Sequence, residues 1–134
     1  AYPPGGNTVI DVNDVIEGMI AAMSKGRQGH RYILGNERLS YKAITEIIFN
    51  VIKEKPPKHR LHKWLLYVVG LGNDALSRLI GKDMYPSLPA VEMSYKFMYY
   101  NSYKAFRELG FKPLVTIEES IRHTHQWYLD SHHF

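Results

Sequence analysis

The stretch of residues 7–35, NTVIDVNDVIEGMIAAMSKGRQGHRYILG, constrains the fold more than any other part of the sequence. A short apolar run is followed by Asp11, whose carboxylate can cap a helix, and by Asp14, whose charge suits the positive end of that helix. Apolar residues then recur at helical spacing until Gly26 ends the run. A second apolar segment, residues 30–34, stops at a glycine. This order predicts strand, helix and strand, and it holds no groups that can be arranged into a reaction centre.

The rest of the sequence is expected to be mostly helical. Residues 8–10 and 30–34 are predicted strands, 97–100 is predicted to be extended, and two prolines, at 86 and 89, are predicted to bracket a loop. Helices are expected to start at Ser40, to span 61–79 and 91–96, to run from Ser102 to Leu109 before Gly110, and to start at a Thr116–Glu119 capping box. Such short strands are too isolated to form a sheet of their own. We therefore predict one α/β domain, residues 1–134, whose few strands need a partner sheet.

Composition excludes several classes of function. The 134 residues contain no cysteine, which excludes disulfides and thiolate metal sites and fits a reducing, cytoplasmic location. The net charge is +4, but charges of both signs are scattered, so we expect no nucleic-acid interface. The longest strongly apolar run, residues 64–69, is too short to span a bilayer. The first seven residues, AYPPGGN, do not resemble a signal peptide and are typical of a loop inside a fold. Together with the missing initiating Met, they indicate a fragment.

Two short motifs match functional patterns but lack the surroundings that those patterns require. GLGNDA, residues 70–75, matches a dinucleotide-binding fingerprint, yet the region about twenty residues on contains two prolines. Helical spacing also continues through these glycines, so we expect a closely packed helix. YNSYK, residues 100–104, matches the Tyr-x-x-x-Lys pair of dehydrogenases, in which lysine lowers the pKa of the tyrosine. Because Ser102 is expected to start the helix, Tyr100 would lie before it and not above Lys104.

Two further patterns favour structural explanations. His123 and His125 are two residues apart, so a helix would point them to different faces, whereas helical metal-binding pairs usually lie four apart. His132 and His133 lie in a tail that is expected to fray, and we expect no metal site. PPGG, residues 3–6, offers few free amides because proline lacks a donor, so a turn into a strand is expected and not a phosphate-binding loop.

Two blocks resemble the C-terminal signature of the extended short-chain dehydrogenases/reductases, which include NAD-dependent epimerases/dehydratases and dihydroflavonol-reductase-like proteins. The first block, residues 9–35, is similar to the family's Val-Asp-Val-x-Asp-Val segment, helix and Arg-Tyr-x-Leu-Gly strand. The second, residues 101–128, is similar to its Ser-x-Lys-Ala helix and closing helix. The matching residues are Asp11, Val12, Asp14, Val15, Gly18, Ala22, Gly26, Gly29, Arg31, Tyr32, Leu34, Gly35, Lys104, Ala105, Glu108, Leu109, Gly110, Phe111 and Pro113.

The resemblance implies the smaller, substrate-binding part of an enzyme whose N-terminal Rossmann half is absent from this sequence. That half would bind NAD or NADP and would carry the catalytic Ser/Thr, Tyr and Lys. We therefore expect no catalytic, cofactor-binding or metal-binding residue here, and no activity from this chain alone. By the same resemblance Gly6, Asn7 and Thr8 would lie near the reacting centre, and a loop with Met84 and Tyr85 could cover a small-molecule substrate.

One departure from the family pattern bears on the substrate. Members that act on nucleotide-diphospho-sugars carry two arginines that grip the diphosphate, a task suited to a guanidinium. Here Asn7 occupies the first position, and residues 91–100 contain no arginine. We therefore predict part of a dihydroflavonol-4-reductase-like oxidoreductase acting on an aldehyde or ketone. The alternatives are part of a nucleotide-sugar epimerase/dehydratase, or a free-standing helical protein-interaction module. A fragment would expose apolar surface, which predicts self-association of the isolated chain.

Overall fold

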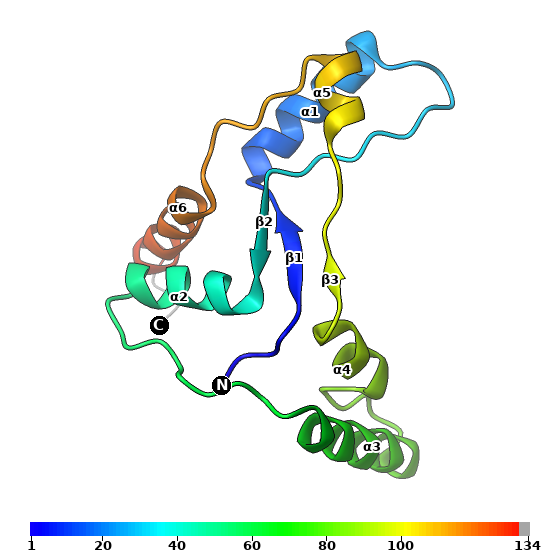
Figure 1. Cartoon of the computed structure of the whole chain (residues 1–134), viewed down its shortest axis with the longest axis vertical. Coiled ribbons are helices and arrows are strands. Elements are labelled where there is room, and N and C mark those ends of the chain that lie inside the picture. The colour runs from blue at the N-terminus through cyan, green and yellow to red at the C-terminus, as the bar shows by residue number, and fades with distance from the viewer. Residues whose placement is uncertain (132–134) are drawn as a thin grey trace.

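The computed structural model describes residues 1–131. Helices predominate, and three short strands lie between them, as the periodicity predicted (Figure 1). The elements are β1 (Gly6–Val9), α1 (Val12–Lys25), β2 (Glu37–Ser40), α2 (Tyr41–Val51), α3 (Lys63–Ile80), α4 (Leu88–Ser94), β3 (Phe97–Met98), α5 (Tyr103–Leu109) and α6 (Ile117–Asp130).

The three strands form one small sheet in the order β2-β1-β3. β1 pairs antiparallel with β2 and parallel with β3. The expectation that the strands are too isolated to pair with one another is therefore wrong. Their pairing depends on a close approach at Gly5, where a Cβ would lie 2.5 Å from the carbonyl oxygens of Ser94 and Lys96. A glycine thus lets segments about ninety residues apart in sequence meet.

The strand predicted at residues 30–34 does not form. Within residues 1–131 no strand pairs with this segment, and β2 begins only at Glu37. Side chains of the α5 region take carbonyls that a neighbouring strand would bind: Lys104 Nζ donates to Arg31 O (3.1 Å), and Ser102 Oγ donates to Gly35 O (2.9 Å). The apolar pattern was real, but a strand also needs a partner, and the described chain supplies none.

Most predicted helix ends are confirmed. The Asp11 carboxylate accepts from Asn13 N, Thr116 and Glu119 form a capping box, and Gly110 ends α5 with φ 71°. Ser102 is the N-cap residue of α5, as predicted, although its hydroxyl donates to Gly35 O and makes no capping hydrogen bond. One prediction is wrong. Pro89 lies in the first turn of α4, where its missing N–H removes no helical hydrogen bond, so it does not bound a loop.

The helices form three groups around the sheet (Figure 1). α1 packs against α5 at one end, where Ala105, Leu109 and Phe111 form a small buried core. α2 packs against α6 at the side, and α3 packs against α4 at the other end. Partly buried residues complete the core: Ile10, Ala21, Ala22, Tyr32 and Leu34.

Candidate functional site

The predicted substrate-lining residues of β1 are fully engaged in the sheet. Thr8 Oγ1 accepts from Tyr100 N (2.8 Å) and donates to Met98 O (3.4 Å), and Asn7 Oδ1 accepts from Thr8 N (2.8 Å). Gly6 is buried so tightly that a Cβ would lie 2.6 Å from Leu39 O. These contacts position β1, and a role toward a substrate stays a prediction.

Met84 and Tyr85, the other predicted lining residues, lie in the loop between α3 and α4. Tyr85 is 81% exposed. In Figure 1 this loop lies beside α4, at the end of the molecule where α3 packs, and a role toward a substrate stays a prediction for Met84 and Tyr85 too.

The GLGNDA motif lies inside α3, where its amides belong to helical turns. A Cβ at Gly70 would meet Val91 Cγ2 at 3.2 Å and Leu88 Cα at 3.3 Å, whereas Gly72 faces open space. The motif therefore serves helix packing at its first glycine. A dinucleotide pyrophosphate needs free amides at a helix start, so these residues do not fit one.

The YNSYK pair is also separated by the structure. Tyr100 precedes α5, is about half exposed, and donates its backbone N–H to Thr8 Oγ1. The ammonium of Lys104 instead lies 4.7 Å from the centre of the Tyr32 ring and donates to Arg31 O. The lysine is thus a structural contact between the two sequence blocks.

The remaining candidate motifs have structural roles or lie outside the described residues. The amides of Gly5 and Gly6, in PPGG, donate to Ser94 O and Lys96 O, so they are not free to bind phosphate. His123 and His125 lie on α6, and His132 and His133 lie outside the described residues. Within residues 1–131, no group of three His, Cys, Asp or Glu side chains is placed to hold a metal ion. In the same range, no helix combines the length and apolarity needed to cross a membrane.

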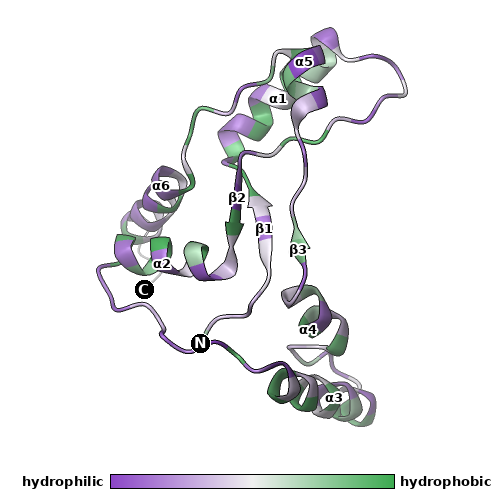
Figure 2. Cartoon of the chain, viewed as in Figure 1, coloured by the Kyte–Doolittle hydropathy of each residue, from purple (hydrophilic) through white to green (hydrophobic). Residues whose placement is uncertain are grey.

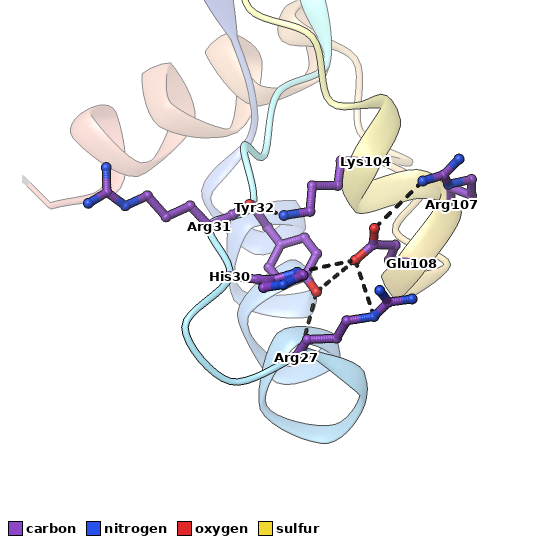
Figure 3. Close-up of polar contacts among 7 residues, drawn as sticks. All are labelled: Arg27, His30, Arg31, Tyr32, Lys104, Arg107 and Glu108. Atoms are coloured by element: carbon purple, nitrogen blue, oxygen red, sulfur yellow. Dashed lines mark hydrogen bonds and ion pairs between the residues drawn. The ribbon is translucent and has the colours of Figure 1, made fainter.

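Sequence reasoning missed one polar cluster, which joins the end of α1 to α5 (Figure 3). The Glu108 carboxylate, with only 12% of its side chain exposed, accepts from the Tyr32 hydroxyl at 3.0 Å. Arg27 Nε, His30 Nδ1 and Arg107 lie 3.7–3.9 Å from its oxygens. Tyr32 OH in turn accepts from Arg27 N (3.1 Å). Tyr32 lies in the first family-like block and Glu108 in the second. Their match to the family pattern was the signal in the sequence that could have pointed to this cluster.

The charges around Glu108 keep its carboxyl ionised. Burial raises its pKa, but the Tyr32 hydrogen bond and the positive charges of Arg27, Lys104 and His30 together bring the pKa below its ordinary value. The cluster therefore holds the irregular segment 30–36 against α5. Its role is structural, and we call it the clamp.

α1 carries an exposed apolar surface on the side away from Leu34 of the unpaired segment 30–36. The α1 face, as we call it, consists of one stripe of α1 that is 48–88% exposed although all its side chains are apolar: Val12, Ile16, Met19, Ile20 and Met23. Ile33, within the unpaired segment, is 47% exposed. The opposite side of α1 is packed, since Gly18 lies against Leu34 and Phe111. An exposed apolar helix stripe and an unpaired extended segment are each surfaces that another helix or sheet can cover.

Comparison with known proteins gives relatives over nearly the whole chain, although no protein-family model matches the sequence. A Synechocystis protein named "Putative dihydroflavonol 4-reductase" is 31% identical over 134 residues, a match that covers 96% of this chain and 38% of the relative. Human dTDP-D-glucose 4,6-dehydratase is 26% identical over 90% of this chain and 29% of its own length.

Solved structures give the same relationship. The gox2253 structure is similar with a TM-score of 0.75 at 29% identity, over 98% of this chain and 39% of that one. The PA4631 structure, named a nucleoside-diphosphate-sugar epimerase from Pseudomonas aeruginosa, shares the fold with a TM-score of 0.73 at 23% identity, over 99% of this chain and 38% of that one. The chain is homologous to extended short-chain dehydrogenases/reductases. It spans less than two fifths of the relatives' length.

The homology bears on the two family-like blocks of the chain. The two blocks that resemble the C-terminal part of an extended short-chain dehydrogenase/reductase are joined in space by the Glu108 cluster. The extended short-chain dehydrogenase/reductase relatives are longer than this chain, as the prediction of an absent N-terminal part requires.

Proposed function

We propose that this chain is the substrate-binding part of an NAD(P)-dependent oxidoreductase that acts on an aldehyde or ketone. The observation that carries the proposal is the 31% identity to the dihydroflavonol-4-reductase-named protein over 96% of this chain. The hydride acceptor or donor and the catalytic Ser/Thr, Tyr and Lys would belong to an N-terminal Rossmann half. Two solved structures of similar fold were obtained with NADPH and with NAD+ and UDP, which supports a nicotinamide cofactor in the whole enzyme.

The local chemistry favours a carbonyl substrate over a nucleotide sugar. Asn7 stands where a diphosphate-binding arginine is expected, and its side-chain oxygen is already used by Thr8 N. β3 and its surroundings, residues 91–100, contribute no guanidinium. A diphosphate at β1 would therefore lack arginine partners at the two positions where the resemblance places them. A nucleotide-sugar epimerase/dehydratase is the second candidate, because dTDP-D-glucose 4,6-dehydratases are among the relatives.

Within the proposed enzyme, this chain would bind and position the substrate. Gly6, Asn7 and Thr8 would line the substrate from the middle strand, and Met84 and Tyr85 would cover it from the α3–α4 loop. The α1 face and the unpaired segment 30–36 would attach this part to the cofactor-binding half. The isolated chain would then bind no nicotinamide cofactor and transfer no hydride.

The test uses the longest natural protein that contains these residues. NAD(P)H oxidation is measured with a panel of aldehydes, ketones and dihydroflavonols, and separately with nucleotide sugars assayed for epimerisation and dehydration. Reduction of a carbonyl compound without turnover of any nucleotide sugar is expected. Turnover of nucleotide sugars alone would transfer the assignment to the second candidate.

A variant pair tests the proposed lining. Tyr85→Ala removes a side chain that is 81% exposed, so it is expected to raise KM for the carbonyl substrate while leaving the thermal midpoint near that of the wild type. Tyr103→Ala, on α5 and 61% exposed, is the matched control and is expected to change neither. Equal KM values for the two variants would remove Tyr85 from the substrate site.

A further inference from the structure

The outer side of α3 is apolar along its whole length. At 100° per residue, the ten positions that face away from α4 span half of the helix surface, and all are exposed. None of them is charged. We call this surface the α3 face; it consists of Trp64, Leu65, Val68, Val69, Leu71, Gly72, Ala75, Leu76, Leu79 and Ile80.

Three polar residues of α3, Tyr67, Asn73 and Asp74, point the other way, toward the protein. Asn73 Nδ2 donates to Pro86 O (3.2 Å), Asp74 Oδ1 accepts from Leu88 N (3.4 Å), and the hydroxyl of Tyr67 lies 3.5 Å from Glu92. The helix is thus oriented opposite to an ordinary surface helix, which buries its apolar stripe and exposes its polar one. Figure 2 shows α3 coloured largely hydrophobic although it lies at the periphery of the chain.

Basic residues are concentrated before the start of the α3 face. No acidic residue occurs between Glu54 and Asp74, and Asp74 is turned toward α4. Trp64, 67% exposed, lies in the first turn of the helix, the position where an aromatic ring meets a lipid–water boundary. The basic residues are Lys58, Arg60 and Lys63 with His59 and His62 before the face, Arg78 within the last turn of α3, and Lys82 after it, where Asp83 follows.

The missing sheet is not the natural cover for the α3 face. The α1 face and the unpaired segment 30–36, which another helix or sheet can cover, lie at the opposite end of the molecule (Figure 1). An uncharged apolar face with basic residues before its start, by contrast, complements a surface that is apolar inside and negatively charged at its boundary.

We propose that the α3 face binds the surface of an anionic lipid bilayer. The 18 residues of α3 extend over about 27 Å, and the helix would lie in the plane of the bilayer with its apolar side chains among the acyl chains. The basic residues before it would meet the phosphates. α3 does not cross the bilayer, in keeping with its length and apolarity. The proposal is independent of the oxidoreductase assignment.

The test is vesicle flotation of the 134-residue chain. One set of vesicles contains phosphatidylcholine with about one quarter phosphatidylserine, and the other contains phosphatidylcholine alone. The double variant Val68→Lys/Leu79→Lys places two charges in the face at positions that are 59% and 83% exposed, so folding is not expected to suffer. Met23→Lys, at an 88% exposed position on the α1 face, is the matched control.

The wild type and Met23→Lys are expected to float with the anionic vesicles and less with the neutral ones. The double variant is expected to bind at least about tenfold more weakly, because two apolar side chains no longer enter the acyl region and two charges take their place. Absence of flotation by the wild type would overturn the proposal. An equal loss of vesicle binding in Met23→Lys would also overturn it, because it would indicate nonspecific binding by exposed apolar residues.

A second readout follows the helix itself. In the variant Trp127→Phe the fluorescence comes from Trp64 alone, because the sequence contains two tryptophans. A blue shift on adding anionic vesicles is expected, and quenching by brominated acyl chains would place Trp64 within the bilayer. The same measurements on the longest natural protein that contains these residues decide whether another part of that protein covers the face. An unshifted spectrum there would overturn the proposal for the whole protein.

Discussion

At the scale of single residues, Glu108 does more for the fold than its position near the end of a short helix indicates. It receives a hydroxyl hydrogen bond from Tyr32 and lies near three cationic or titratable side chains from two sequence blocks. Because its pKa lies below the ordinary value of 4.5, the ionised form is the one that the folded state favours. The clamp therefore depends on pH.

We predict that Glu108→Gln reduces the pH dependence of stability. The depressed pKa means that the carboxylate contributes fully above its unfolded pKa and that this contribution is lost as the pH falls through the folded pKa. The difference in free energy of unfolding between wild type and variant should be largest at about pH 6 and should shrink below about pH 4.5. Urea unfolding at a series of pH values measures it.

The control for Glu108 is Glu46→Gln, which removes a half-exposed partner of Lys42. Exposed pairs of this kind contribute little, so Glu46→Gln should stay close to the wild type at every pH. A Glu108→Gln variant with a constant deficit from neutral to acid pH would show that the charge of Glu108 is irrelevant and that only its shape matters.

The two glycines of α3 offer a second prediction at this scale. Gly72→Ala should stabilise the chain by up to about 1 kcal/mol, because alanine favours the helix and its Cβ would meet nothing. Gly70→Ala should give no such gain, because its Cβ would press on the backbone of Leu88. Thermal unfolding of the pair measures the difference. A stabilising Gly70→Ala would contradict the close packing of α3 on α4.

At the scale of elements, Asp14 shows a connection that helix patterning did not reveal. Its charge was expected to stabilise the start of α1, and it does lie in the first turn. The carboxylate is buried, however, and accepts from Leu114 N (3.0 Å) and Val115 N (3.1 Å). It therefore ties α1 to the connection between α5 and α6.

We predict that Asp14→Ala destabilises the chain by about 2–3 kcal/mol, since two backbone N–H groups lose a charged acceptor. Glu17→Ala, an exposed change on the same helix, should cost far less. Urea unfolding gives the free energies, and hydrogen exchange should show faster exchange at Leu114 and Val115. If these two amides stayed protected in Asp14→Ala, the tie would not depend on the carboxylate.

The helices were predictable because their signals are local. Caps such as Asp11 and Thr116 and stops such as Gly110 act within one or two turns, so the sequence around them suffices. The sheet was not predictable, because β1 meets β3 across ninety residues through Gly5 and Gly6. The strand expected at 30–34 fails for the complementary reason: its pattern is local, but its pairing partner is not.

In the candidate site, too, local patterns were predictable from the sequence and contacts between distant segments were not. The resemblance of two blocks predicted the family, and homology confirms it. The blocks did not predict that Tyr32 and Glu108 touch, because contact across 76 residues is not a property of either block. The lining residues from β1 and from the α3–α4 loop stay predictions, because only the family resemblance places them near a substrate.

At the scale of the whole molecule, the chain has too little core for its apolar content. Hydrophobic residues make up 45% of the sequence, yet within residues 1–131 the fully buried ones are Val91, Ala105, Leu109 and Phe111. Much of the exposed remainder lies on the α1 and α3 faces, and the rest, such as Tyr85 and Leu114, is scattered. Two separate unpartnered faces imply two separate partners, and they can be tested separately.

We predict that the isolated chain self-associates through the α1 face. In sedimentation velocity at micromolar concentration, the wild type should sediment as species heavier than the 15.5 kDa monomer. Exposed apolar side chains and an unpaired extended segment each favour contacts between copies. Ile16→Lys/Met23→Lys should shift the distribution toward monomer, because both side chains lie on that face.

Two controls separate this association from the lipid contact. Leu114→Lys alters an isolated side chain that is 85% exposed, and it should leave the distribution unchanged. Val68→Lys/Leu79→Lys should also leave it unchanged while weakening vesicle binding. If the α3 variant dissociated the oligomers and the α1 variant did not, the α3 face would be the contact between copies. A monodisperse wild-type monomer would contradict self-association altogether.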